Sequence, residues 1–294
     1  MNVLMAFHHF PVSTGRYVSD ALRRAGHDVR TIGAAMDVNT GWGRKADAKY
    51  IHVPSGKGQH TDWHDWQPDI VIITDPRVPK HWRHATYRNA PHVVYNTCNN
   101  VTNLESDTKD HYFLAHKHAK SWPCKNGDTF LPNAYDPVWH TPSTVPFEQR
   151  TYDAAFVGAL HPDRKAVVNA MRADGYLVDV QHGPIFAEYS EIYHQARVAI
   201  VTTTHGHSGA SMRFFENAAH GCLVLAGPCA DKDELKPDGI VWFENHTDAR
   251  EKAAHYLRNP DEARAMIARS MAWVQPHTWD ARAATIIEWL EKRG

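Results

Sequence analysis

The sequence lacks the features that would place it at once in a membrane, in a secretory pathway or on nucleic acid. No run approaches the roughly 18 consecutive apolar residues that a membrane helix needs, and the start MNVLMAFHHF lacks the basic-then-apolar layout of a signal peptide. The formal net charge is only -1, which argues against bulk electrostatic binding of nucleic acid but leaves room for a local basic patch. We therefore expect a cytoplasmic protein with no membrane span.

Paired cysteines and metal-binding motifs are also missing. The four cysteines include no CxxC pair, which is typical of unpaired thiols in a reducing compartment. The 22 histidines include no HExxH or Cys/His ligand spacing, so we predict no metal site. No GxGxxG follows the first apolar segment, where FHHFPVSTG stands instead, and this argues against a nicotinamide-dependent dehydrogenase.

What the sequence does contain is an alternation of apolar strands and amphipathic helices over 294 residues, of which 43% are hydrophobic. The pattern starts with a strand at 2–7, a helix at 14–25 and a strand at 28–33. A short strand is predicted at 50–53, and further apolar strands are predicted at 69–74 and 92–96. This order indicates a parallel sheet with crossover helices.

A second series follows a proline-rich segment, FLPNAYDPVWHTPSTVPFEQR at 130–150, whose four prolines oppose regular structure and predict a linker. The elements predicted after it are strands at 152–157, 177–181, 198–202 and 223–226, and helices at 164–174, 185–195, 212–220, 248–258, 260–274 and 279–292. We therefore predict an α/β fold of two Rossmann-like lobes, facing each other across a cleft. The predicted lobes span 1–137 and 138–276, and a C-terminal helix at 277–294 packs back towards the first lobe.

Candidate binding residues gather at the carboxyl ends of the strands of the second lobe, where open parallel sheets bind ligands. Gly158 ends a buried strand shortly before Arg164 at a helix start, and this pair suits a phosphate group. The loop TTTHGHSG offers backbone amides just before another helix. Its predicted anion-binding residues are His207, Ser208 and Gly209.

A further candidate is the spacing of Arg213 and Glu216 at the front of the helix in GASMRFFENAAHGCLVLAGP. Three residues apart, they share one helix face. Arg213 can clamp a diphosphate, and Glu216 can accept hydrogen bonds from a ribose diol. The alternative is an i,i+3 salt bridge on a solvated helix, worth roughly a few tenths of a kcal/mol. The neighbouring Phe214 and Phe215 favour a helix held against the core, with its charged face turned to a cleft.

Four segments carry a resemblance to a known family: MRFFENAAHGCLVLAGP, FVGALHPDRKAVVNAM, FLPNAYDPVWHTP and HTWDARAATIIEWL. The first is similar to the Arg-x-Phe-Glu-x-x-Ala-x-Gly segment of GT-B glycosyltransferases, in particular the spore-maturation (CgeB-type) group. The second resembles the first strand and helix of that group's nucleotide-binding domain. The others resemble its Leu-Pro-x-Ala-x-Asp-Pro linker and its closing His-Thr-aromatic-x-x-Arg helix. The similarities cover roughly residues 130–290.

The resemblance implies an enzyme that transfers a sugar from a nucleoside diphosphate to an acceptor. In this family the C-terminal lobe holds the nucleotide and the N-terminal lobe holds the acceptor. By motif position, Glu216 would bind the ribose, and Arg213 and Arg164 would hold the diphosphate. Many retaining members carry Glu-x7-Glu, and Ser208 stands at the first of these Glu positions here, which leaves the donor sugar and the stereochemistry open.

The mechanism that this site implies needs no metal. Cationic and amide donors on the diphosphate stabilise the charge that develops as the sugar leaves, and they can replace the divalent ion that other glycosyltransferases hold with an Asp-x-Asp motif. Asp231 and Asp233 have that spacing, but they follow Gly227 and Pro228 at a predicted helix start. We interpret them as a cap and dipole-favoured acids rather than as metal ligands.

An inverting enzyme also needs a general base near the acceptor hydroxyl. Asp75 and His9 follow apolar strands of the first lobe, where catalytic groups are expected. The alternatives are a turn-forming Asp-Pro for Asp75, and a packed or exposed side chain for His9. A retaining enzyme would require neither residue as a base.

The acceptor is the least determined part of the prediction. Several aromatic and basic residues of the first lobe have the character of an exposed site that stacks and holds a sugar, a nucleobase or a peptide. They are Trp63, Trp66, Arg77, Lys80, Trp82, Arg83 and Arg88. A saccharide, a protein and a modified DNA base, as in phage enzymes, all remain open. Two other functions share the predicted fold: a nucleotide-sugar epimerase and a non-catalytic nucleotide-sugar-binding protein.

Overall fold

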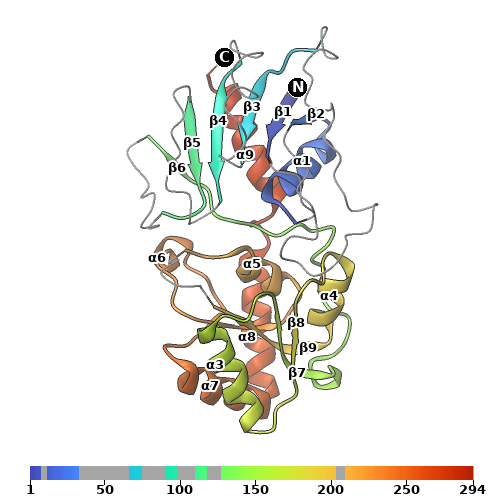
Figure 1. Ribbon diagram of the computed structural model, residues 1–294, viewed down its shortest axis with the longest axis vertical. Helices are drawn as coiled ribbons and strands as arrows, with labels where there is room; N and C mark the ends of the chain where they lie inside the picture. The colour runs from blue at the N-terminus through green and yellow to red at the C-terminus, as the bar shows by residue number, and fades with distance from the viewer. Residues whose placement is uncertain are drawn as a thin grey trace. The chain divides into compact units, whose positions relative to one another are not determined.

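The computed structural model describes residues 1–7, 12–32, 66–74, 90–97, 110–117, 127–202 and 209–293. The chain divides into two compact units. The N-terminal unit comprises residues 1–132 together with 279–294, and the C-terminal unit comprises residues 133–278. Each unit is built on a parallel sheet accompanied by helices (Figure 1), so the predicted α/β architecture with two Rossmann-like halves is confirmed.

The sheet of the N-terminal unit has the strand order β2-β1-β3-β4-β5-β6. Its strands are β1 (Asn2–Ala6), β2 (Asp28–Ile32), β3 (Ile70–Ile73), β4 (His92–Asn96), β5 (His111–Leu114) and β6 (Thr129–Phe130). Every residue of β3 and β4 is buried, as expected of parallel strands covered on both faces. Helix α1 (Thr14–Arg24) begins after Ser13, whose side chain accepts a hydrogen bond from the Arg16 N–H and so satisfies one of the helix's first donors.

The last helix, α9 (Trp279–Glu291), belongs to the N-terminal unit and packs against α1. The fully buried Trp279 stacks on Tyr17, with 6.0 Å between the ring centroids. Beside them, Nε of Arg24 lies 2.8 Å from a carboxylate oxygen of Asp280. The predicted return of the C-terminal helix to the first lobe is therefore confirmed.

The sheet of the C-terminal unit has the strand order β11-β10-β9-β7-β8. Its strands are β7 (Tyr152–Val157), β8 (Val178–Gln181), β9 (Ala196–Val201), β10 (Leu223–Ala226) and β11 (Val241–Trp242). The accompanying helices are α3 (Pro162–Ala173), α4 (Ala187–His194), α5 (Met212–Ala219), α6 (Lys232–Leu235), α7 (His246–Arg258) and α8 (Pro260–Val274). The side chains of β7, β9 and β10 form a continuous core with those of α3, α7 and α8.

The proline-rich segment is mostly irregular, as predicted, and the boundary between the two units falls within it. From Asn133 onward it belongs to the C-terminal unit, and it includes the short 3₁₀ helix η3 (Phe147–Gln149). The buried guanidinium of Arg150 donates hydrogen bonds to the carbonyls of Ala196 and Gly221, at 3.0 and 2.8 Å. Proline removes a backbone donor but does not prevent packing, so this segment lies against the sheet as part of its unit.

Trp66 is predicted to be exposed, but it is buried in the structure. It is 6% exposed, its indole N–H donates to Asp28 at 2.8 Å, and the guanidinium of Arg30 lies 4.6 Å from the centre of its ring. Because it is buried and its donor is engaged inside the unit, Trp66 is not available to stack on an acceptor. The other six residues of that predicted set, and the strand predicted at 50–53, lie outside the described residues.

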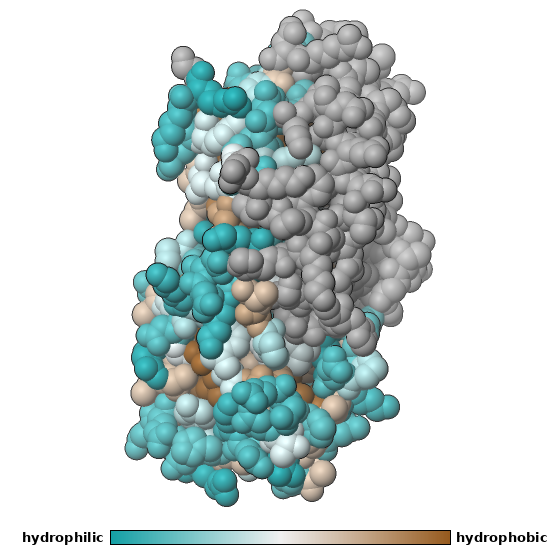
Figure 2. All heavy atoms as spheres, turned by 90° about the vertical axis from the view of Figure 1, so that its left-hand side faces the viewer, coloured by the Kyte–Doolittle hydropathy of each residue, from teal (hydrophilic) through white to brown (hydrophobic). Residues whose placement is uncertain are grey.

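The described surface presents few large apolar side chains. Those exposed are Met1, Val138 and Leu177. Figure 2 shows one side of the molecule, on which the coloured surface is predominantly hydrophilic and brown is confined to small areas. Among the described helices, none is long and apolar enough to cross a membrane.

Candidate nucleotide site in the C-terminal unit

Gly158 and Arg213 meet at the carboxyl end of β7. Gly158 has a φ of +138°, a value that favours glycine, and a Cβ built on it would lie 2.6 Å from Nη2 of Arg213. Arg213, in the first turn of α5, donates from Nε to the carbonyl of Val157 at 2.9 Å. Gly158, which the sequence analysis assigns to phosphate binding, therefore provides the space that the guanidinium of Arg213 occupies.

Arg164 lies in the first turn of α3 and reaches the same end of the sheet. It is 7% exposed, and it donates to the side chain of Thr202 at 2.9 Å and to the carbonyl of Ala159 at 2.8 Å. Its guanidinium carbon and that of Arg213 lie 5.1 and 5.9 Å from the centre of the Phe156 ring. The two cations are thus anchored beside one another after β7.

These two arginines carry positive charge that no carboxylate of the described residues neutralises through an ion pair. Burial and, second, the positive charge of Arg213 lower the pKa of Arg164 to about 10. Two neighbouring like charges disfavour one another, and an anion placed between them would remove that penalty. The arrangement can therefore accept a phosphate or diphosphate group.

Glu216 is one turn further along α5 and is 6% exposed. Its Oε2 accepts a hydrogen bond from the hydroxyl of Tyr189 at 2.8 Å, and its Oε1 lies 3.6 Å from Nε2 of His140. Between the described residues Arg213 and Glu216 there is no ion pair, so the alternative of a solvated i,i+3 salt bridge is wrong. The carboxylate belongs instead to a buried polar cluster that extends across α4 and the segment before β7.

His140 and Tyr189 flank Glu216 as uncharged groups. Nδ1 of His140 lies 3.0 Å from the backbone nitrogen of Asp136 and 3.1 Å from the carbonyl oxygen of the same residue. Burial lowers the pKa of His140, and the imidazole is therefore neutral at pH 7. Burial, followed by the charge of Glu216, raises the pKa of Tyr189 well above its ordinary value, which keeps its hydroxyl protonated as a donor.

A second buried histidine, His220, lies beside this cluster. His220 is fully buried after the end of α5, stacks on Tyr193 with 5.6 Å between the ring centroids, and lies 3.0 Å from Ser190 Oγ through Nε2. Burial and, second, nearby His140 lower the pKa of His220 well below its ordinary value. The site is therefore backed by rings that are uncharged near neutral pH.

Other predicted site residues are placed only in part. His207, Ser208, Asp75 and His9 lie outside the described residues. Gly209 is described and buried just before α5.

The Asp-x-Asp pair lies at the start of α6. Asp231 occupies the N-cap position of α6, as interpreted, but makes no capping hydrogen bond with its side chain. Across the described part of the chain, no three side chains of the metal-binding types gather in one place.

Sequence reasoning missed Tyr189 and His140. They lie 27 and 76 positions before Glu216 along the chain, and neither has a spacing that links it to the carboxylate. The one available signal was the buried face of the helix predicted at 185–195. It indicates that Tyr189 faces inward but not which residue it meets.

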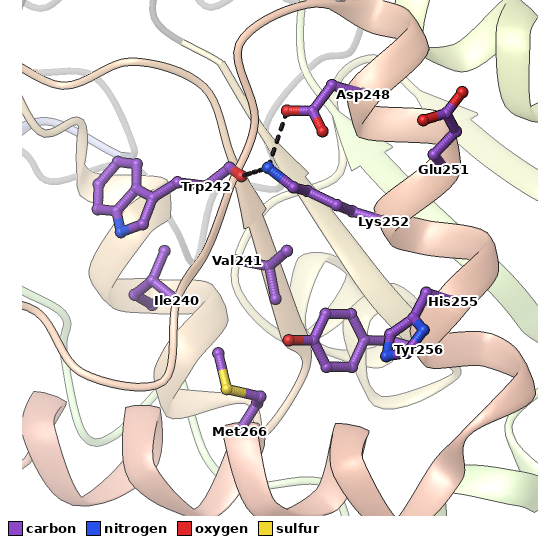
Figure 3. Close-up of a pocket in the computed structure, with 9 residues that line it drawn as sticks. All are labelled: Ile240, Val241, Trp242, Asp248, Glu251, Lys252, His255, Tyr256 and Met266. Carbon is purple, nitrogen blue, oxygen red and sulfur yellow. Dashed lines mark hydrogen bonds and ion pairs between the residues drawn. The ribbon is translucent and has the colours of Figure 1, made fainter.

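A separate cavity of about 430 Å³ lies between β11, α7 and α8 (Figure 3). Its lining residues are Ile240, Val241, Trp242, Asp248, Glu251, Lys252, His255, Tyr256 and Met266. Nζ of Lys252 donates to the carbonyl of Trp242 at 2.7 Å and to Asp248 at 2.8 Å, so this lysine is already paired. None of the predicted nucleotide-site residues lines the cavity.

Residues 149–288 match the model of a family described as glycosyl transferase-like. Among solved structures, sucrose-phosphate synthase from Thermosynechococcus elongatus is 12% identical with a TM-score of 0.66, covering 100% of this chain and 99% of that one. Anabaena HepE in complex with UDP-glucose is 10% identical with a TM-score of 0.70, covering 99% and 100%. An α-glucosyltransferase bound to UDP and a 13-mer DNA containing an HMU base is 11% identical with a TM-score of 0.65, covering 99% of each chain. The search of curated proteins gave no match.

Proposed function

We propose that this chain is a GT-B glycosyltransferase whose C-terminal unit binds a nucleoside diphosphate sugar as donor. The match of residues 149–288 to a glycosyl transferase-like family and the fold shared with solved glycosyltransferases support this. The sugar is transferred to an acceptor hydroxyl. Two of the structural neighbours are complexes with UDP or UDP-glucose, and this supports a UDP-sugar as the donor here. The finer likeness to the CgeB-type group belongs to the same proposal and rests on the four sequence segments alone.

One observation carries the proposal: two guanidinium groups lie beside each other at the end of β7, next to a buried carboxylate on the same helix as one of them. Arg213 and Arg164 supply charge for a diphosphate, while Glu216 supplies acceptors for ribose hydroxyls. In a parallel sheet this edge is where nucleotides bind. An epimerase or a simple binding protein would also hold the nucleotide here, so the products of turnover separate these functions.

The proposed chemistry is electrostatic. As the bond between sugar and phosphate breaks, negative charge grows on the departing diphosphate, and the two fixed guanidinium groups stabilise it without reorganising. Removing one such donor typically raises a barrier by about 2–4 kcal/mol. We propose that these arginines do the work that a divalent ion does in other glycosyltransferases, and that activity persists in EDTA.

The acceptor side of the proposal rests on the sequence. His9 or Asp75 would act as general base if the reaction inverts the sugar. For the acceptor itself, the neighbour that holds DNA with an HMU base supports including hydroxymethylated DNA among the candidates, next to saccharides and proteins.

Arg213→Ala tests the proposal. With a radiolabelled UDP-sugar and a panel of saccharide and hydroxymethylated DNA acceptors, we expect the wild type to release UDP and the variant to lose about 30- to 1000-fold in kcat/KM. Arg250→Ala is the matched control, because Arg250 lies on α7 and pairs with Asp174. Equal activity of the two variants would remove Arg213 from the site, and interconversion of sugars without UDP release would indicate an epimerase.

A further inference from the structure

The carboxylate of Glu216 is held from behind by one tyrosine hydroxyl. Tyr189 is the third residue of α4 and 8% exposed, and its hydroxyl donates to Oε2 of Glu216 at 2.8 Å. A phenol has one proton to give. This bond therefore commits one acceptor position on Oε2, and it fixes the rotation of the carboxylate about its last bond.

The remaining acceptor positions of Glu216 match two neighbouring hydroxyls. Nε2 of His140 lies 3.6 Å from Oε1, which is too long for a hydrogen bond, and no other described residue donates to that oxygen. A carboxylate offers about four acceptor positions, so both oxygens keep capacity after the bond from Tyr189. A ribose presents its 2′- and 3′-hydroxyls side by side, whereas a 2′-deoxyribose presents only the 3′-hydroxyl.

Tyr189 is itself held in a fixed place. Phe186, directly before α4, has a φ of +52°, a conformation that a phenylalanine keeps only when its surroundings enforce it. Its buried ring packs against Trp139 with 4.6 Å between the centroids, and Ser190 Oγ donates to the carbonyl of the same Trp139. Anchors on both sides of Tyr189 thus tie α4 to the segment before β7.

We propose, resting on the proposed function, that Tyr189 is a positioning residue that aims Glu216 at the 2′- and 3′-hydroxyls of the donor, and that the site thereby selects ribonucleoside over 2′-deoxyribonucleoside diphosphates. Pre-organised acceptors bind better than mobile ones because less freedom is lost on binding. The missing 2′-hydroxyl of a deoxyribonucleotide would leave a buried charged acceptor without its partner, which is costly.

Calorimetric titration tests this with UDP, GDP and ADP, each beside its 2′-deoxy counterpart. For the nucleotide that binds, we expect wild type to prefer the ribose form by about tenfold or more, the effect of one hydrogen bond to a charged group. Glu216→Gln should abolish this preference, and Tyr189→Phe should reduce it several-fold. Tyr193→Phe is the matched control, since its hydroxyl on the same helix accepts from the Val157 N–H at 3.1 Å rather than bonding to Glu216; it should keep the wild-type ratio.

The outcomes separate this inference from the proposed function. If Glu216→Gln loses the preference while Tyr189→Phe keeps it at the wild-type value, Tyr189 does not position the carboxylate, and the donor site stands. If wild type binds ribose and deoxyribose forms equally, the selectivity is wrong while nucleotide binding stands. If no nucleoside diphosphate binds, both proposals fall. Thermal melting of each variant checks that a lost preference does not reflect an unfolded protein.

Discussion

At the scale of single residues, both the backbone conformation of Gly158 and its contact with the proposed site disfavour a side chain at this position. Its φ is +138°, and a Cβ added to it would lie 2.6 Å from Nη2 of Arg213, so a side chain is opposed for two separate reasons. An alanine here has to strain its own backbone and also push the guanidinium away.

Gly158→Ala is therefore expected to lower the free energy of unfolding by about 1–3 kcal/mol and to weaken nucleotide binding through displacement of Arg213. Chemical denaturation and calorimetry measure the two effects. Gly175→Ala is the control, because Gly175 also has a positive φ, +87°, but a Cβ there would meet nothing within 4 Å. Equal nucleotide affinity in both variants would show that Gly158 does not shape the site.

His220 gives a prediction about acid stability. Its pKa is lowered by burial in the folded protein, so below about pH 6.5 the unfolded chain binds a proton that the folded chain does not. The contribution of this histidine to stability is complete above that pH and is lost as the pH falls towards the folded pKa, by up to about 1.4 kcal/mol per pH unit.

His220→Phe, which keeps a ring against Tyr193, should flatten the fall of the melting temperature between about pH 7.5 and 5.5, the range around the ordinary histidine pKa. The exposed His246 provides the control, and His246→Gln should melt with the wild-type pH dependence. A wild-type slope in His220→Phe would mean that other groups set the acid sensitivity.

At the scale of elements, the helix starts differ in how they are capped. The side chain of Asn245, before α7, accepts from the N–H groups of Thr247 and Asp248. Ser211, before α5, makes no such bond with its side chain. The first start is thus stabilised locally, whereas the second is held by the packing of α5 on the core.

Asn245→Ala should accordingly cost about 1 kcal/mol of unfolding free energy, and Ser211→Ala should cost clearly less. Urea denaturation of the two variants beside wild type decides this. The same loss in both would show that the capping hydrogen bonds of Asn245 do not determine its contribution to stability.

The elements themselves were largely predictable, because apolar periodicity depends on local sequence. The strands β4, β7 and β10 and the helix α8 begin and end where the pattern places them. β11, with two residues, and α6, with four, are too short to leave a periodic signal. β5 (His111–Leu114) lies in a stretch whose apolar run is brief, and the sequence pattern does not predict it.

The candidate site was predictable only where its residues are close in the sequence. Arg213 and Glu216 share one helix, so their spacing already places them together. Tyr189 and His140 reach Glu216 through tertiary packing, which no spacing rule encodes. The prolines of the segment before β7 indicated a linker, and the hydrogen bonds of Arg150 that attach it to the sheet could not be anticipated from composition.

At the scale of the whole molecule, the division into two units predicts that a mutation in one core destabilises mainly the unit that contains it. Trp279 is fully buried against Tyr17 and Tyr95, within the N-terminal unit. Removing so large a side chain from a core usually costs about 3–5 kcal/mol.

Trp279→Ala should therefore speed hydrogen exchange in β1, β3 and β4 while leaving β7, β9 and β10 protected. Trp273→Ala, which removes a ring stacked on Phe215 in the C-terminal unit, is the reciprocal control. Faster exchange of both sheets in either variant would show that the two units unfold as one.

The position of α9 also bears on how the chain is made. Because this helix covers α1 yet follows all of the C-terminal unit in sequence, a ribosome delivers every residue of the second unit before the first has its last helix. Vectorial synthesis usually lets the leading domain fold first. Here the C-terminal unit can fold first, because all of its residues are synthesised before α9. The N-terminal sheet lacks the side chain of Trp279 until that helix has been made.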